Sequence, residues 1–264
     1  MPTESVSIVV PTFREAENIP VLTERLFQTL NDAGINAELL IVDDNSGDGS
    51  QAAVEKLSGR YPIRIIVRTE ERGLSSAVIR GFAEARHGIL LCMDGDLSHP
   101  PESVPEVIGP IAENRAEFCI GSRYVSGGST VDEWGFLRRL NSWGATLLAK
   151  PLTGVGDPMA GFFCLRRSTL ERAEAAGLNP VGYKIGLEIL VRAGCKDVAE
   201  VPIRFADRLH GESKLTIGQQ IQYLKHLWRL YRFKRPALAP LGLFLVCSLA
   251  VIAIGWAIRH GFGE

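Results

Sequence analysis

Apolar runs and amphipathic stretches alternate along the first part of the chain. Short continuous apolar runs, typical of strands covered on both faces, lie at residues 6–10, 38–42, 63–67 and 89–93. The segments between them are predicted helices, in which apolar residues face one side, at residues 15–31, 50–57 and 74–86. This alternation predicts an α/β fold, with a mainly parallel sheet, right-handed crossovers and helices on both faces.

The pattern continues less regularly in the second half. Further helices are expected at residues 102–113, around 136–143 and at 182–193, and further strands at 116–120, 162–165 and 198–205. Before the second of these strands, the segment Asp157 to Gly161 is expected to form a turn. We therefore expect a single large α/β domain over residues 1–214.

The C-terminal part has a different pattern. Residues 215–236 form a predicted amphipathic helix, whose apolar stripe consists of Ile217, Ile221, Leu224, Trp228 and Tyr231. Its other face is polar and basic, with Gln219, Gln222, Lys225, His226, Arg229 and Arg232. A basic amphipathic helix of this kind is typical of a membrane surface, although an ordinary helix packed on the domain is the alternative.

An uncharged apolar segment follows, at residues 237–258. A helix of about 18–22 residues is roughly 27–33 Å long, close to the thickness of a bilayer core. The basic residues before it favour a cytoplasmic domain with one C-terminal transmembrane helix and a short tail, residues 259–264. A buried core helix is the alternative interpretation of the span.

Two carboxylates directly follow the apolar run at residues 89–93. Asp94 and Asp96 are one residue apart and would point the same way if the extended conformation persisted. Paired carboxylates are oxygen ligands suited to Mg²⁺ or Mn²⁺, and the carboxyl ends of parallel strands are where such sheets bind ligands. Two solvated acids in a loop are the alternative.

Composition and missing motifs exclude several functions. The net charge of −1 gives no argument for nucleic-acid binding, and the five cysteines are scattered without a Cys-x-x-Cys pair. No Gly-x-Gly-x-x-Gly follows the first strand and no P-loop motif occurs, which argues against NAD and against a P-loop NTPase. Acids at the ends of the first two strands suit a base and ribose, so the pyrophosphate would need a metal.

Basic residues at two places are candidates for holding phosphate. Arg138 and Ser142 are four residues apart and share one helix face, which could bind a phosphate, although a solvated arginine is the alternative. The polar segment 208–214 is an expected loop, and loops that carry Arg and Lys beside a ligand edge often clamp phosphates.

With these residues in view, the chain resembles the family 2 glycosyltransferases of the GT-A nucleotide-sugar-binding fold, and within them the dolichyl or polyprenyl-phosphate mannose synthases. The matching stretches occur in the family's order across nearly the whole predicted catalytic domain: residues 9–18, 42–46, 93–100, 121–124, 138–142 and 208–214. The resemblance implies an inverting, metal-dependent transfer of mannose from GDP-mannose to a polyprenyl or dolichyl phosphate in the membrane.

The resemblance also implies roles for single residues. The donor would be bound by Pro11, Phe13, Glu15, Val42, Asp44, Asp94, Gly95, Asp96, Lys184, Arg208 and Lys214. The metal would be held by Asp94 and Asp96, with Ser98 as a third ligand. The lipid phosphate would be bound by Arg123, Arg138 and Ser142, and the residues expected to matter most for turnover are Asp96, Arg123 and Arg138.

Some residues depart from the family's pattern. Phe13 and Arg14 stand where the family usually has Tyr and Asn, and Ser98 stands where some members have Gln. The donor therefore stays open at this point, because a polyprenyl-phosphate glucose synthase using UDP-glucose would carry the same motifs. Outside this class, the alternatives are a sugar nucleotidyltransferase and a membrane-tethered binding module without turnover.

Overall fold

The computed structural model describes residues 4–130, 136–206 and 217–236, without the side chains of residues 136–143 and 217. The chain divides into two compact units, Met1–Lys214 and Leu215–Glu264. Each unit is taken separately below.

The first unit is built on a seven-stranded sheet in the described residues, with the order β3-β2-β1-β4-β7-β5-β8. Its strands are β1 (Val6–Thr12), β2 (Ala37–Asp43), β3 (Ile63–Val67), β4 (Ile89–Cys92), β5 (Phe118–Ser122), β7 (Phe163–Arg166) and β8 (Val198–Pro202). All neighbouring strands are parallel except β7, which runs antiparallel to both β4 and β5. The mainly parallel α/β sheet predicted from the apolar runs is confirmed.

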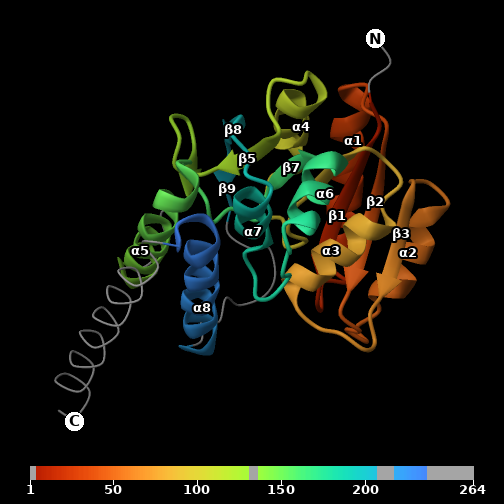
Figure 1. Cartoon of the computed structure of the whole chain (residues 1–264). Helices are drawn as coiled ribbons and strands as arrows, with labels where there is room; N and C mark the ends of the chain where they lie inside the picture. Colours follow the sequence, from red (N-terminus) through yellow and green to blue (C-terminus); the bar gives the residue numbers. More distant parts are fainter. Residues whose placement is uncertain (1–3, 131–135, 207–216, 237–264) are drawn as a thin grey trace. The chain divides into compact units, whose positions relative to one another are not determined.

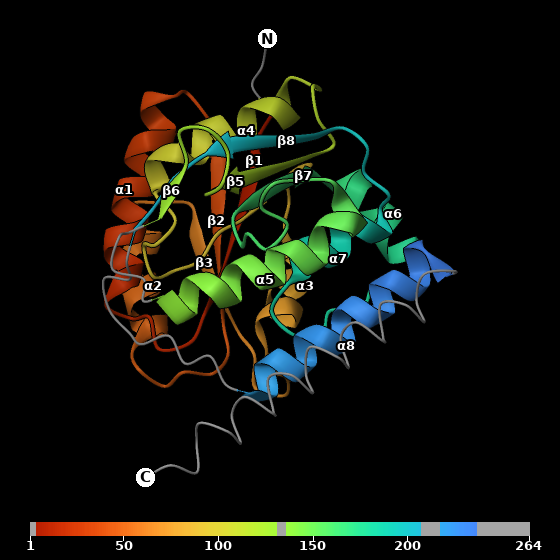
Figure 2. The same cartoon turned by 90° about the vertical axis from the view of Figure 1, so that its left-hand side faces the viewer.

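Helices cover both faces of this sheet (Figures 1 and 2). One face packs on α1 (Asn18–Asp32), α2 (Ser50–Ser58) and α4 (Val104–Ala112), the last preceded by the 3₁₀ turn η1 (Pro101–Ser103). The other face packs on α3 (Leu74–Glu84), α6 (Arg167–Ala175) and α7 (Ile185–Arg192). The two cores follow from strand alternation, since Ile8 and Val10 of β1 face the first while Val9 faces the second.

The remaining elements of the first unit are one long helix and a small second sheet. Helix α5 (Phe136–Thr153) contacts α7, and β6 (Ser129–Thr130) pairs in parallel with β9 (Arg204–Phe205). The predicted strand 198–205 is therefore wrong in its extent, because it divides into β8 and β9 at Ile203. Helix α6 was not anticipated at all.

The second unit contains helix α8 (Ile217–Lys234) in its described part. Two residues of the predicted apolar stripe, Ile221 and Trp228, are 48% and 36% exposed, so this part of the stripe does not pack against protein. The buried side chains are instead Tyr223, His226, Leu227 and Leu230, which repeat at helical spacing. The exposed face thus combines Ile221 and Trp228 with basic residues, and the guanidinium of Arg232 lies over the Trp228 ring.

Across the described residues, no helix has the length and apolar character needed to span a bilayer. The predicted transmembrane segment 237–258 and the tail 259–264 lie outside those residues.

Candidate active site

The predicted site residues gather where β1, β2 and β4 end. Strand β1 lies between β2 and β4, with Thr12 opposite Asp43 and Val9 opposite Cys92. Because these three strands are parallel, the segments that follow them meet at one edge of the sheet. The two acidic pairs of the sequence, 43–44 and 94–96, are therefore neighbours at this edge.

The segment with Asp94 and Asp96 is a bend rather than a continued strand. Strand β4 ends at Cys92, and Leu97 has a φ of 63°, so the condition for the two acids to point the same way, a continued strand, is not met. Oxygen Oδ1 of Asp96 accepts hydrogen bonds from the amide (3.1 Å) and the hydroxyl (2.6 Å) of Ser98. Ser98, which was expected to bind metal, orients Asp96 in this structure.

His99 holds the other acid of the pair in place. The amide of Asp94 donates to Nδ1 of His99 at 2.9 Å, and the buried imidazole stacks on Phe162 with centroids 5.2 Å apart. Burial lowers the pKa of His99, although the charges of Asp94 and Asp96 oppose this shift. The neutral ring therefore acts as a hydrogen-bond acceptor that shapes the loop, a role that the sequence did not reveal.

The carboxylate oxygens at this bend suit a divalent cation whose remaining coordination positions are filled by a bound ligand or by water. Asp96 is almost fully buried, while the Asp94 side chain is 31% exposed. A Cβ on Gly95 would lie 3.2 Å from Val10 and Thr12, so the bend passes close over β1. Within the described residues, no three His, Cys, Asp or Glu side chains form a complete metal cage. Two carboxylates leave coordination positions for phosphate oxygens and water, as Mg²⁺ prefers.

A second segment, residues 157–161, contains a buried carboxylate whose role the sequence analysis did not predict. Asp157 is fully buried and accepts two parallel hydrogen bonds from the Arg123 guanidinium, at 2.8 and 2.9 Å. Burial tends to lower the pKa of Arg123, but the hydrogen bonds and charge of Asp157 outweigh it, so the pKa is raised. Glu200 in turn accepts the amides of Gly156 and Asp157. The predicted turn is thus the support that fixes Arg123.

Lys184 is half-buried beside this segment. Its Nζ donates to the carbonyl of Met159 at 2.9 Å. Burial, followed by the nearby charge of Arg123, lowers the pKa of Lys184 to about 8, against the opposing effects of Asp94 and Asp157. The acid Asp94, the cations Arg123 and Lys184, and their support Asp157 therefore share one electrostatic environment.

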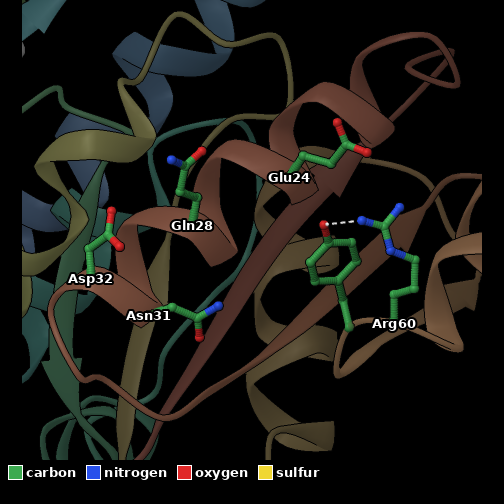
Figure 3. Close-up of a pocket in the computed structure, with 6 residues that line it drawn as sticks. Glu24, Gln28, Asn31, Asp32 and Arg60 are labelled. Atoms are coloured by element: carbon green, nitrogen blue, oxygen red, sulfur yellow. Dashed lines mark hydrogen bonds between the residues drawn. The ribbon is translucent and has the colours of Figure 1, made fainter.

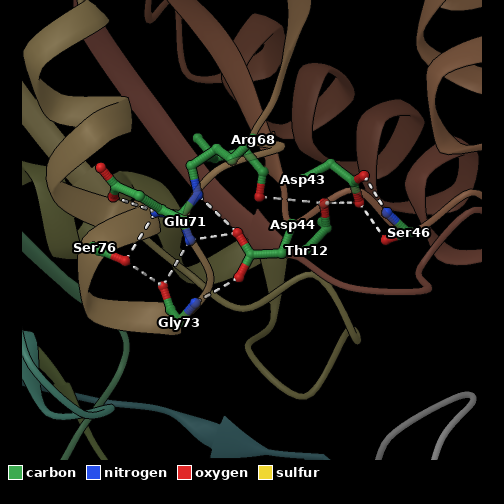
Figure 4. A network of polar contacts seen from close by, with 9 residues as sticks. Thr12, Asp43, Asp44, Ser46, Arg68, Glu71, Gly73 and Ser76 are labelled. Carbon is green, nitrogen blue, oxygen red and sulfur yellow. Dashed lines mark hydrogen bonds and ion pairs between the residues drawn. The ribbon is translucent and has the colours of Figure 1, made fainter.

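The residues predicted for the base and ribose lie at the ends of β1 and β2. Phe13 is 47% exposed, with the guanidinium groups of Arg14 and Arg72 at 5.3 and 5.6 Å from its ring centre. Asp44 is bound by Arg68 and by the amide of Gly73, as Figure 4 shows. Val42 is fully buried in the core, so a contact between Val42 and a ligand would have to come from its backbone.

The other two residues of this group lie beside them. Pro11 is near the end of β1, and the carboxylate of Glu15 accepts a hydrogen bond from the side-chain Nδ2 of Asn18.

Four predicted phosphate-binding residues lie outside what the structure describes. Arg208 and Lys214 fall between the described segments, and Arg138 and Ser142 lie in the part of α5 whose side chains are not described. Their roles stay predictions.

A surface hollow of about 430 Å³ lies away from this edge (Figure 3). It is lined by polar side chains near the end of α1 and before β3: Glu24, Gln28, Asn31, Asp32, Arg60 and Tyr61. Since helices return antiparallel to the strands they follow, these residues belong to the opposite edge of the sheet. None of the predicted site residues lines this hollow, and we assign no role to it.

Comparison with known proteins identifies the family. The family model described as glycosyl transferase family 2 matches residues 7–173, which include the strand ends, the acidic bend and the Arg123–Asp157 pair. The chain belongs to glycosyltransferase family 2. As a family 2 glycosyltransferase it is an enzyme, which confirms both the predicted class and the resemblance.

Curated relatives of this glycosyltransferase are similar over most of its length. A protein named dolichol-phosphate mannosyltransferase from Pyrococcus furiosus is 43% identical, over 87% of this chain and 64% of that protein. Another of the same name from Mycosarcoma maydis is 44% identical, over 97% of this chain and 88% of that protein. This chain therefore spans less than two thirds of the Pyrococcus protein but most of the fungal one.

A solved structure shares the fold of this glycosyltransferase. Glucosyl-3-phosphoglycerate synthase from Mycobacterium tuberculosis, in complex with Mn²⁺, UDP and glucosyl-3-phosphoglycerate, gives a TM-score of 0.60 at 19% identity. The match covers 88% of this chain and 80% of that one. At this level of identity the likeness concerns the fold, which agrees with the predicted GT-A type.

Proposed function

We propose that this enzyme transfers mannose from GDP-mannose to a dolichyl or other polyprenyl monophosphate, with inversion at the anomeric carbon. The observation that carries the proposal is the 44% identity with a dolichol-phosphate mannosyltransferase over 97% of the chain. The arrangement of charges at the sheet edge supports it, because that arrangement suits two anionic substrates.

The acceptor oxygen of a phosphate monoester needs no general base. Its second pKa is about 6, so it is already ionised near neutral pH. The main barrier is instead repulsion between acceptor and donor, since unit charges about 4 Å apart repel by about 4 kcal/mol at an effective dielectric of about 20. Arg123 and Lys184, which lie in the same electrostatic environment as Asp94, would offset this repulsion.

Asp94 and Asp96 would hold Mg²⁺ or Mn²⁺ on the donor diphosphate. A bound divalent cation would neutralise charge on the leaving nucleoside diphosphate as the glycosidic bond breaks. In this chain, Ser98 orients Asp96 and His99 fixes the backbone of Asp94, so both carboxylates are placed before a ligand binds. The synthase of the same fold was crystallised with Mn²⁺, which is consistent with a divalent ion here.

The acceptor phosphate and the donor phosphates would be bound by two different groups of residues. Arg123, Arg138 and Ser142 would bind the acceptor phosphate, and Asp157 holds the Arg123 guanidinium by its Nε and Nη2 edge. Lys184, Arg208 and Lys214 would bind the donor phosphates.

The acceptor's lipid requires the enzyme to work at a membrane. Moving a polyprenyl chain into water costs about 0.8 kcal/mol for each CH₂ group. The exposed side of α8, with Trp228 and Arg232, is of the amphipathic kind that lies at lipid headgroups. We propose that α8 lies on the membrane, that residues 237–258 span it, and that the catalytic domain is cytoplasmic.

Substitution of Asp96 tests the proposed chemistry. Asp96→Ala should abolish mannose transfer, because it removes a metal ligand from the bend. Asp96→Asn should also be inactive, although its amide oxygen can still accept the bonds from Ser98 and preserve the fold of the bend. Mannolipid formation is measured with purified enzyme at saturating Mg²⁺, and thermal melts establish that each variant is folded. Full activity of either variant would refute the mechanism.

A further inference from the structure

Arg68 lies at the centre of a polar network around Asp44, one of the residues proposed to bind the donor nucleotide (Figure 4). Its Nε donates to Oδ1 of Asp44 at 2.7 Å, and its Nη2 donates to the same oxygen. Nη1 donates to the hydroxyl of Ser76 at 2.8 Å, and Nη2 to the carbonyl of Gly73 at 3.0 Å. Arg68 is only 7% exposed, so its guanidinium is directed to these protein groups rather than to solvent.

The network leaves the Asp44 carboxylate little freedom. Arg68 binds Oδ1, and the amide of Gly73 donates to Oδ2 at 2.7 Å. A carboxylate has about four acceptor positions, so Oδ2 keeps one for a donor N–H or O–H of a ligand. The Asp44 side chain is 12% exposed, and a fixed orientation of its second oxygen is therefore what a nucleoside would meet.

The same network fixes the start of helix α3. Gly73 precedes the helix with a φ of 129°, which side-chain-bearing residues rarely adopt, and its carbonyl and amide are both bound in the network. Two residues further along, the amide of Ser75 donates to the carbonyl of Gly182 at 3.2 Å. Gly182 lies two residues before Lys184, whose ammonium is held by Met159. The segment held by Arg68 is thus bonded directly to the segment that carries Lys184.

We propose that Arg68 is the positioning residue of the nucleotide pocket. It orients Asp44 toward the nucleoside and, through Gly73 and Ser75, keeps the 182–184 segment in place, so that a nucleoside diphosphate meets both ends of its site already arranged. Prearrangement raises affinity because ordering these groups is not required at the moment of binding. This role rests on the proposed function, since it assumes that Asp44 and Lys184 bind the donor.

The test separates this role from a stabilising one by replacing Arg with Lys. Arg68→Lys keeps the charge beside Asp44 but loses the planar fork that reaches Asp44, Ser76 and Gly73 together. Arg192→Lys is the matched control, because Arg192 also pairs with a buried carboxylate, Glu188, and with a backbone carbonyl. Ser76→Ala removes one anchor of the guanidinium and provides a milder variant.

Nucleoside diphosphate binding by the full chain is measured calorimetrically with GDP and with UDP in the presence of Mg²⁺, alongside thermal melts. We expect Arg68→Lys to weaken GDP binding by about tenfold and Ser76→Ala by about threefold, with Arg192→Lys within about twofold of wild type. In steady-state transfer, Arg68→Lys should raise the donor KM and leave the acceptor KM unchanged.

Each outcome decides a separate claim. Equal nucleotide affinity of wild type and Arg68→Lys, or an equal loss in Arg192→Lys at a matched melting temperature, would overturn the positioning role. A wild type that binds UDP but not GDP would overturn the proposed donor, while the effect of Arg68→Lys on UDP affinity would still decide the positioning role. Binding of neither nucleotide would overturn both.

Discussion

At the scale of single residues, the candidate active site brings cationic and carboxylate side chains close to one another. Lys184 has a pKa of about 8 because its ammonium is buried and lies near Arg123. The opposing carboxylates Asp94 and Asp157 only partly compensate for this. A diphosphate bound nearby would favour the charged ammonium, so nucleotide binding and protonation of Lys184 are linked.

This linkage predicts a pH dependence of donor binding. The charged fraction of Lys184 falls as the pH rises through about 8, so GDP affinity should weaken over that range. Lys184→Met should bind GDP more weakly near neutral pH and should lose the step in the pH profile. Affinities measured by calorimetry across this range test the prediction. An identical step in Lys184→Met would show that another group is responsible.

Single residues also show which parts of the site could not be predicted from the sequence. Asp94 and Asp96 were expected at a site because they directly follow a predicted strand, whereas Arg123 and Lys184 were expected there only from the resemblance to family 2 glycosyltransferases. Asp157 gave no such signal, since its partner Arg123 is 34 residues away and the Asp-Pro dipeptide is a common turn. Long-range polar partners of this kind have no local pattern, so they emerge only from the fold.

At the scale of elements, packing of α3 on the sheet depends on a glycine. A Cβ on Gly81 would lie 2.4 Å from a methyl group of Val9 and 3.0 Å from one of Val42. Helix α3 therefore approaches β1 and β2 more closely than a larger residue allows. Because Gly73 directly precedes α3, this close packing also sets the position of the segment that binds Asp44.

Two helix glycines of different surroundings test this packing. Gly81→Ala should lower the free energy of unfolding by about 1–3 kcal/mol, because the extra methyl group overpacks the core. Gly109→Ala in α4 is the control, since the closest atom to its Cβ would be Glu113 Oε1, at 3.9 Å. The control should gain up to about 1 kcal/mol from helix propensity. Denaturant unfolding measures both, and a neutral Gly81→Ala would contradict the close approach.

Elements with strong apolar patterns were predictable, and weakly patterned ones were not. The first four strands were expected within a few residues of their observed bounds, because each is a short continuous apolar run bounded by polar or turn residues. The antiparallel direction of β7 was not expected, since an apolar run does not encode strand direction. Helix α6 was missed because it buries only Thr169, Leu170 and Ala173 along a mostly polar segment. For α8, the helix was predicted, but its buried residues Tyr223, Leu227 and Leu230 are not part of the predicted apolar stripe.

At the scale of the whole molecule, the two units are expected to serve different substrates. The first unit contains Arg123 and the described residues that we propose bind the donor, and the second contains the amphipathic helix α8. In our proposal the water-soluble nucleotide sugar needs only the first unit, whereas an acceptor embedded in lipid also needs the second.

Ending the chain after Leu215 tests this division. The shortened protein should bind GDP with nearly wild-type affinity but should transfer little mannose to a polyprenyl phosphate in vesicles. Calorimetry and a vesicle transfer assay measure the two properties, with thermal melts to establish that the shortened chain is folded. Unchanged transfer in vesicles would refute a membrane role for the second unit.

The most direct test of the central claim is a transfer assay with two donors. The full chain is incubated with vesicles that contain a polyprenyl phosphate, and labelled GDP-mannose or UDP-glucose is added with Mg²⁺, with Mn²⁺ or with EDTA. Our account predicts label in the lipid phase from GDP-mannose alone, and loss of that label in EDTA. Label from UDP-glucose alone, or mannose transfer that persists in EDTA, would contradict it.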